Sequence, residues 1–200
     1  NYTLVARAPD HAEKSVSVQL GPGETKVVDL QLTRQKAAPV VSKGGMSDFD
    51  EAAAWTRDGN WFVRRGGNLV TFRPTPVSGI FVFTASLRNG RRLQWFLARS
   101  DDKNYVLFQM DKKNFYRAQV VNGKDKELAK VPHKQDKQDY WTLQIEVTAT
   151  SVVHKLHDGE KWTVLDEWRD AGRNFSAGKF GFYIPGRDQY ALSNFSFLPQ

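Results

Sequence analysis

The chain has 200 residues, of which 40% are hydrophobic and 12% aromatic, so it can form one large β domain, alone or with a small appendage. It has no cysteine, which excludes disulfides, thiolate catalysis and cysteine-based zinc sites. Its net charge of +7 comes from residues 34–200, because residues 1–33 hold only three of the 29 basic and four of the 22 acidic groups.

Residues 1–33 predict three short strands. The first is expected over the apolar run 2–6, the second over the alternating segment 15–20, and the third over 25–32. Between the last two, proline and glycine at the second and third positions of 21–24 favour a type II turn. Three strands of this length bury too little surface to be stable alone.

Four motifs in this segment carry a family resemblance. They are Tyr2-Thr3-Leu4-Val5-Ala6-Arg7-Ala8-Pro9, Val16-Ser17-Val18, Gly21-Pro22-Gly23-Glu24-Thr25 and Val28-Asp29-Leu30-Gln31-Leu32. The segment resembles the C-terminal part of a PEGA or carboxypeptidase-regulatory-like domain, although Asp10-His11 stands where such domains carry glycine and an aromatic residue. The resemblance implies a partial β module over 1–33 that serves as an extracytoplasmic bacterial spacer.

Residues 34–47 predict a linker, because alanine, proline, lysine and glycine occur there without hydrophobic periodicity. Ser47 and Asp50 fit a capping pair. A helix of one or two turns is therefore expected over 51–55.

From residue 60 onward, short strands alternate with turns such as Asn122-Gly123 and Asp158-Gly159, which suit tight hairpins. The expected strands are 60–64, 68–72, 79–88, 92–99, 104–110, 114–121, 126–130, 140–148, 151–157, 162–168, 178–184 and 190–198. This spacing predicts an all-β domain over 48–200, built as a two-sheet antiparallel jelly-roll sandwich. A closed barrel is the main alternative.

The same region holds an ordered set of short motifs. They are Asn60-Trp61, Gly67-Asn68-Leu69-Val70, Gly79-Ile80-Phe81-Val82-Phe83, Trp141, His157-Asp158-Gly159, Gly178-Lys179-Phe180-Gly181-Phe182-Tyr183 and Asn194-Phe195-Ser196-Phe197. Their order resembles the concanavalin A-like lectin/glucanase superfamily, in particular bacterial laminin-G-like and 3-keto-disaccharide-hydrolase-type domains. The resemblance implies the sandwich fold but leaves the function open, because this superfamily includes lectins, hydrolases and inert modules.

The acidic residues do not form a catalytic pattern. Retaining glycosidases need two carboxyl groups on one face of the fold, close enough to cooperate. Glu146 stands alone on its expected strand, whereas Asp166 and Glu167 are adjacent and point to opposite faces. The sequence therefore disfavours a glycosidase of this kind.

Metal sites are also disfavoured. His154 and His157 lie three residues apart on an expected strand, so they face opposite sides and are interpreted as surface or turn histidines. Asp101, Asp102 and Asn104 have the oxygen ligands that calcium prefers, but a turn is the favoured interpretation. No metal or cofactor is predicted.

The remaining candidate is a polar sheet face. The side chains assigned to it are Gln94, Tyr105, Gln109, Arg117, Gln119, Gln144 and Glu146. The opposite phases of the same strands hold Trp95, Leu97, Phe108, Val120, Trp141, Leu143 and Ile145, which suit the core. Amide, guanidinium and carboxylate groups can bond sugar hydroxyls while an aromatic ring stacks on a sugar.

The predicted function is a non-catalytic, extracytoplasmic bacterial recognition module for a glycan or cell-envelope polymer. One alternative is a sugar-processing hydrolase of the 3-keto-disaccharide-hydrolase type, with Glu146 or a histidine as acid or base. Another is a structural or sensor ectodomain, for example of a membrane kinase. Nucleic acid is disfavoured, because the basic residues alternate with aspartates and no RNP-like motif is present. No apolar run approaches the roughly 20 residues that span a bilayer.

Overall fold

The computed structural model describes residues 1–6, 14–29, 45–133 and 139–200. The chain divides into two compact units, Asn1–Val41 and Ser42–Gln200. No helix of the described residues is long and apolar enough to cross a membrane.

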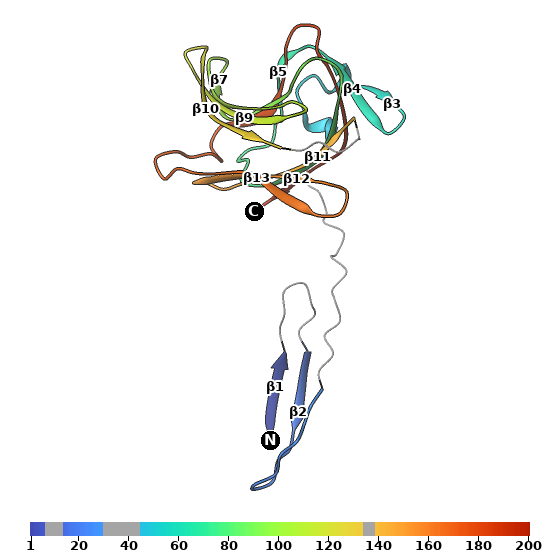
Figure 1. Ribbon diagram of the computed structural model, residues 1–200, viewed down its shortest axis with the longest axis vertical. Helices are drawn as coiled ribbons and strands as arrows, with labels where there is room; N and C mark the ends of the chain where they lie inside the picture. Colours follow the sequence, from blue (N-terminus) through green and yellow to red (C-terminus); the bar gives the residue numbers. More distant parts are fainter. Residues whose placement is uncertain (7–13, 30–44, 134–138) are drawn as a thin grey trace. The chain divides into compact units, whose positions relative to one another are not determined.

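The first unit contains an antiparallel pair of strands, β1 (Tyr2–Ala6) and β2 (Lys14–Val18) (Figure 1). The type II turn is confirmed, since Glu24 donates its N–H to the Gly21 carbonyl (3.1 Å) and Gly23 has a φ of 78°.

The third strand predicted for this unit, over 25–32, is not found in the residues that the structure describes, so this prediction is wrong there. Residues 25–29 form no strand, and 30–32 lie outside the described residues. Val27 is 93% exposed. A strand needs a partner for its N–H and C=O groups, and alternating apolar residues do not supply one.

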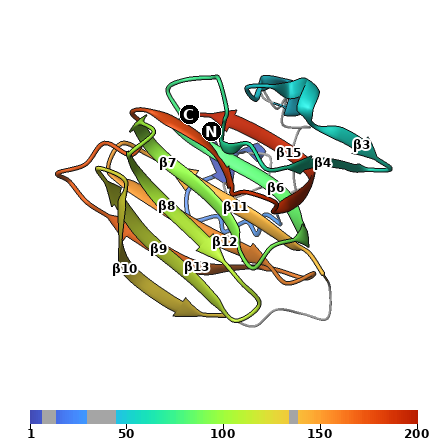
Figure 2. The ribbon, with the colours of Figure 1, turned by 90° about the horizontal axis from the view of Figure 1, so that it is seen from above.

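Two antiparallel sheets form the second unit and confirm the predicted sandwich (Figures 1 and 2). The six-stranded sheet has the order β10 (Lys124–Pro132), β9 (Asn114–Val121), β8 (Asn104–Met110), β7 (Leu93–Asp101), β14 (Lys179–Ile184), β5 (Asn68–Thr71). The seven-stranded sheet has the order β13 (Trp162–Arg169), β12 (Ser151–His157), β11 (Trp141–Val147), β6 (Gly79–Asn89), β15 (Gln189–Pro199), β4 (Trp61–Arg65), β3 (Thr56–Asp58).

All twelve strands expected from residue 60 onward are present, and only β3 was not predicted. Its three residues are polar and exposed, so they carry no alternation signal. The short helix expected over 51–55 is present as a 3₁₀ turn, Ala52–Ala54, and a second 3₁₀ turn, Met46–Asp48, precedes it. The capping pair expected from Ser47 and Asp50 is wrong, because Glu51 is the N-cap of the turn Ala52–Ala54 and makes no side-chain capping bond; in the turn Met46–Asp48, Asp48 accepts the Gly45 N–H (2.8 Å).

Aromatic side chains from both sheets fill the space between them. Phe81 on β6 stacks on Phe180 of β14, with ring centroids 4.1 Å apart. Phe72, Phe83 and Trp95 are fully buried in the same core. Rings with large apolar area suit the gap between two packed sheets, and they hold the outer faces in a fixed position.

Gly181 of the predicted glycine-rich strand is needed because of a close approach between strands. A Cβ at this position would collide with the backbone oxygen of Val70 and the ring of Phe96. We expect Gly181→Ala to lower the free energy of unfolding by about 1–3 kcal/mol, as overpacking does. Urea unfolding measures this change. The matched control is Gly45→Ala, where a Cβ meets no atom within 4 Å; an equal loss in both variants would contradict the argument.

Candidate functional site

The outer face of the six-stranded sheet presents a connected polar array. Gln109 on β8 donates to the Gln94 side-chain oxygen on β7 (2.7 Å) and accepts from the Arg92 guanidinium (2.7 Å). The Arg92 guanidinium lies over the Tyr116 ring, 4.1 Å from its centroid. Three strands thus contribute planar or aromatic groups to one surface, which we call the Gln94–Tyr116 array; it also includes Asp111.

Asp111 anchors one edge of this array. Its carboxylate accepts the Tyr116 hydroxyl (2.9 Å) and the backbone N–H groups of Lys113 and Asn114 (both 2.8 Å). Burial raises the pKa of Asp111, but these hydrogen bonds and the Arg92 charge outweigh burial and lower the pKa below its usual value. Asp111 is therefore an ionised acceptor, which does not suit a general acid.

Next to the array lies an apolar patch on the same outer face. Leu107, Ala118 and Val120 form a small cluster separate from the main core, and Tyr105 and Tyr183 pack against it. Burial raises the pKa of the Tyr105 phenol, which keeps it a hydrogen-bond donor. The patch thus combines half-buried aromatic rings with hydroxyl groups at their edges.

An irregularity in β7 shapes the far end of this face. Ala98 has a φ of 51°, and the pairing of β7 with β8 shifts register after Leu97. Arg99 consequently lies over the Phe96 ring, at 5.6 Å, and donates to the Thr71 hydroxyl (2.5 Å). A bulge of this kind redirects a side chain that regular alternation would point into the core.

A buried tyrosine of the opposite sheet fixes the strands that form this outer face. The buried Tyr190 hydroxyl, from β15 of the opposite sheet, lies 2.8 Å from the Arg92 carbonyl oxygen and 2.9 Å from that of Tyr183. These contacts tie β7 and β14 to the second layer. The array is therefore held by a rigid support rather than by a loop.

Three of the seven predicted binding residues share this face: Gln94, Tyr105 and Gln109. The prediction that all seven lie on one face is wrong. Arg117 points between the sheets, where it pairs with Asp166 of β13 (3.0 Å). Gln119 lies two residues further on β9 and shares that inward phase. Both phases of β9 contain apolar residues, so alternation did not reveal which side is buried.

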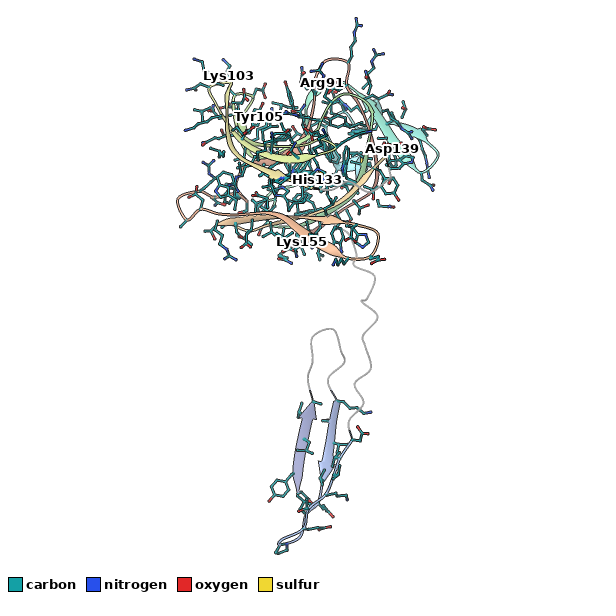
Figure 3. The ribbon with its side chains drawn as sticks, in the orientation of Figure 1. Arg91, Lys103, Tyr105, His133, Asp139 and Lys155 are labelled. Atoms are coloured by element: carbon teal, nitrogen blue, oxygen red, sulfur yellow. The ribbon has the colours of Figure 1, made fainter. Side chains whose placement is uncertain are left out.

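Gln144 and Glu146 lie on the outer face of the seven-stranded sheet. Gln144 donates to Glu146 (2.6 Å), which also pairs with Lys155. Figure 3 shows Lys155 on the side of the sandwich opposite Tyr105. Trp141, Leu143 and Ile145 are buried as predicted, whereas Val120, expected in the main core, belongs to the outer patch.

The two remaining groups of candidates are structural. His154, interpreted as a surface or turn histidine, is fully buried and accepts a hydrogen bond from the Trp95 indole (3.1 Å). Asp101 accepts the Lys103 N–H (2.7 Å) and the Asn104 amide (2.9 Å), which is the geometry of a turn. In the part of the chain that the structure describes, no group of three or more His, Asp and Glu side chains could hold a metal ion.

Sequence reasoning missed Arg92, Asp111, Tyr116 and Tyr183 as members of this face. Arg92 is the first residue of the expected strand 92–99 and has the same phase as Gln94, so alternation could have found it, whereas Asp111 follows its strand and lies outside the alternating pattern. Two features identify members of this face. One is the tight turn at Asp111, and the other is Tyr116 of β9, which pairs with Gln109 of β8.

The second unit is a two-sheet antiparallel β-sandwich, a fold that it shares with solved structures of other proteins. No family model matches the chain, and no curated protein matches it.

Three solved structures illustrate the likeness. Carbohydrate-binding module CBM66 from Bacillus subtilis has a TM-score of 0.57 at 16% identity, covering 72% of this chain and 90% of that one. A mutant GH43 protein BlXynB from Bacillus licheniformis has a TM-score of 0.56 at 11% identity, covering 80% of this chain and 38% of that one. Xylan β-1,4-xylosidase from Bacillus halodurans C-125 has a TM-score of 0.54 at 11% identity, covering 97% of this chain and 46% of that one. The chain spans less than half of either longer protein, and identities this low show the fold alone.

Proposed function

We propose that this protein is a non-catalytic recognition module that binds a glycan on the outer face of its six-stranded sheet. The observation that carries the proposal is the Gln94–Tyr116 array together with the adjoining patch: amide and guanidinium groups lie beside the buried Tyr116 ring, and the half-buried rings of Tyr105 and Tyr183 lie next to them. Sugar hydroxyls need several oriented donors and acceptors, and the apolar face of a sugar ring packs well on an aromatic ring. The similarity to a carbohydrate-binding module supports this proposal.

The arrangement of carboxylates supports binding over hydrolysis. The partners of Asp111 are a hydroxyl, two backbone N–H groups and Arg92, with no second carboxyl group among them. Glu146, the acid or base of the alternative hydrolase, is paired with Gln144 and Lys155 on the other sheet. Glycoside cleavage by two carboxyl groups needs them about 5–10 Å apart across one substrate. The similarity to the GH43 protein and to the xylosidase keeps a hydrolase as the second candidate.

Two further proposals rest on the sequence. We assign residues 48–200 to the concanavalin A-like superfamily on the order of their motifs, and residues 1–33 to a PEGA-like spacer joined by the segment 34–47. This combination is typical of an exported bacterial protein. We therefore propose an extracytoplasmic location, where glycans and envelope polymers are accessible.

The proposal predicts which variants lose binding. Screening the intact chain on a glycan array identifies a ligand, and titration calorimetry then measures its affinity. We expect Gln109→Ala and Tyr105→Ala to weaken binding about tenfold or more, which corresponds to about 1.4 kcal/mol. Gln109 links Arg92 to Gln94, so its loss removes one polar group from the face and releases two others.

Gln144→Ala is the matched control, because it removes the same side chain from the opposite sheet. It should leave the affinity unchanged. If Gln144→Ala weakens binding while Gln109→Ala does not, the ligand lies on the seven-stranded sheet and the assigned face is wrong.

A further inference from the structure

Two pockets share no residue with the Gln94–Tyr116 array, and only Arg91 and Lys112 of the second are sequence neighbours of its members. The first, of about 610 Å³, opens on the seven-stranded sheet and is lined by Trp61, Tyr140 and neighbouring polar side chains. The second, of about 540 Å³, lies where the β6–β7 turn meets the start of β11, and Arg88 and Arg91 line it. Neither pocket is needed for the function proposed above.

Arg88 joins the two pockets. It lines the second pocket, and its guanidinium carbon lies 5.8 Å from the centroid of the Trp61 ring in the first. The chain also passes directly from Asp139 in the second pocket to Tyr140 in the first. We call this continuous surface the Trp61–Arg91 groove; its length suits an elongated ligand rather than a single small molecule.

The first half of the groove has the chemistry of a sugar site. The rings of Trp61 and Tyr140 have centroids 6.3 Å apart and planes inclined at 57°, and Tyr140 is 40% exposed. Beside them the hydroxyls of Thr84 and Thr142 lie 3.1 Å apart. One ring can pack on the apolar face of a sugar while the threonines bond its hydroxyls.

The second half is cationic. Arg91 has no ion pair in the described part of the chain, and Arg88 and Lys112 lie 3.9 Å from exposed Asp58 and Asp139. Exposed pairs at such distances contribute little, so all three cations are accessible to an anionic group. These three cations belong to residues 34–200, the part of the chain that carries the net positive charge.

A buried donor without an acceptor lines the same pocket. Trp141 is 3% exposed, and its indole N–H has no hydrogen-bond partner among the described residues. A buried N–H left unsatisfied costs about 1–3 kcal/mol. The indole N–H is sealed from solvent, so an acceptor oxygen in the pocket reaches it only when the ring shifts toward the ligand.

From these features we infer that the Trp61–Arg91 groove is a second binding site, specific for an acidic saccharide. The sugar ring lies against Trp61 and Tyr140, and its carboxylate or sulfate lies among Arg88, Arg91 and Lys112. A single-stranded nucleic acid fits less well, because the two rings are inclined at 57° to each other and so do not form a platform on which successive bases can stack.

Calorimetric titration of the full chain tests this inference with four probes: a uronic acid oligomer, a sulfated oligosaccharide, a neutral oligosaccharide of equal length, and a single-stranded oligonucleotide. We expect binding of at least one acidic saccharide, which weakens as salt rises, and none of the neutral one at this groove. The carboxylated and sulfated probes distinguish the two anion chemistries. Trp61→Ala and Arg91→Gln should each reduce that binding about tenfold.

The controls lie on the same sheet. Trp162→Ala removes another exposed tryptophan and Arg169→Gln another exposed arginine, both from β13, and neither should change the affinity. Three results would overturn the inference. The control variants could lose as much affinity as Trp61→Ala and Arg91→Gln, the neutral probe could bind equally well through Trp61 and Arg91, or the oligonucleotide could bind more tightly than the acidic saccharides. Gln109→Ala separates the two sites, since it should leave acidic-saccharide binding at this groove intact.

Discussion

Asp166→Ala is expected to lower the free energy of unfolding by about 3–4 kcal/mol, because it leaves a charge buried without its partner. Asp166 pairs with Arg117 at 3.0 Å, and their side chains are 8% and 15% exposed. Arg117 also lies over the Trp168 ring, at 4.6 Å, so the structure fixes it between the sheets. Without the carboxylate, the Arg117 guanidinium has no ion-pair partner among the described residues and stays in a poorly solvated site. Urea unfolding at neutral pH measures the change.

Two comparison variants isolate the effect. Glu167→Ala removes the adjacent carboxylate, whose pair with Arg169 is exposed, and should cost less than about 1 kcal/mol. The double variant Arg117→Met with Asp166→Leu should be far more stable than Asp166→Ala alone, because it removes both charges together. If Asp166→Ala and Glu167→Ala are equally stable, the pair is not buried in the way we describe.

The second large effect concerns His154 and acid stability. Its ring is fully buried, and burial, aided by the nearby Arg117 charge, lowers its pKa from 6.5 to about 3. The unfolded chain therefore takes up a proton as the pH falls below about 6.5, whereas the folded chain does not. The stability that neutral His154 contributes is complete above that pH, and it falls by about 1.4 kcal/mol per pH unit toward pH 3.

His154→Gln tests this dependence, because glutamine cannot be protonated but its oxygen can still accept the Trp95 indole N–H. We expect the stability difference between wild type and variant to move by about 3 kcal/mol in favour of the variant between pH 6.5 and pH 4. Urea unfolding at a series of pH values gives the two curves. His157→Gln, on the other face of the same strand, is the matched control. Parallel curves for wild type and His154→Gln would show that His154 does not titrate on unfolding.

The strands were predictable because their signal is local. Alternation of apolar residues and Asn-Gly or Asp-Gly turns depend on neighbours in sequence, and they located twelve of the strands of the second unit. The third strand expected after Gly23 failed for the opposite reason. Val28 alternates with its neighbours correctly, but pairing depends on a partner strand that local sequence does not specify.

The candidate site was predictable only in part, because it depends on which strands become neighbours. Gln94 and Gln109 were assigned together and do face each other across β7 and β8. Gln144 has the correct outward phase but belongs to the other sheet. Arg117 was placed outside because a charge is expensive to bury, and its partner Asp166 lies 49 residues away in sequence.

The most direct test of the glycan-binding account is a crystal structure of the protein with the oligosaccharide that binds most tightly on the array. We predict a sugar ring packed against Tyr105, with hydroxyl groups bonded to Gln94 or Gln109. A sugar held only elsewhere on the sandwich, or a molecule that binds no glycan at all, would contradict the account.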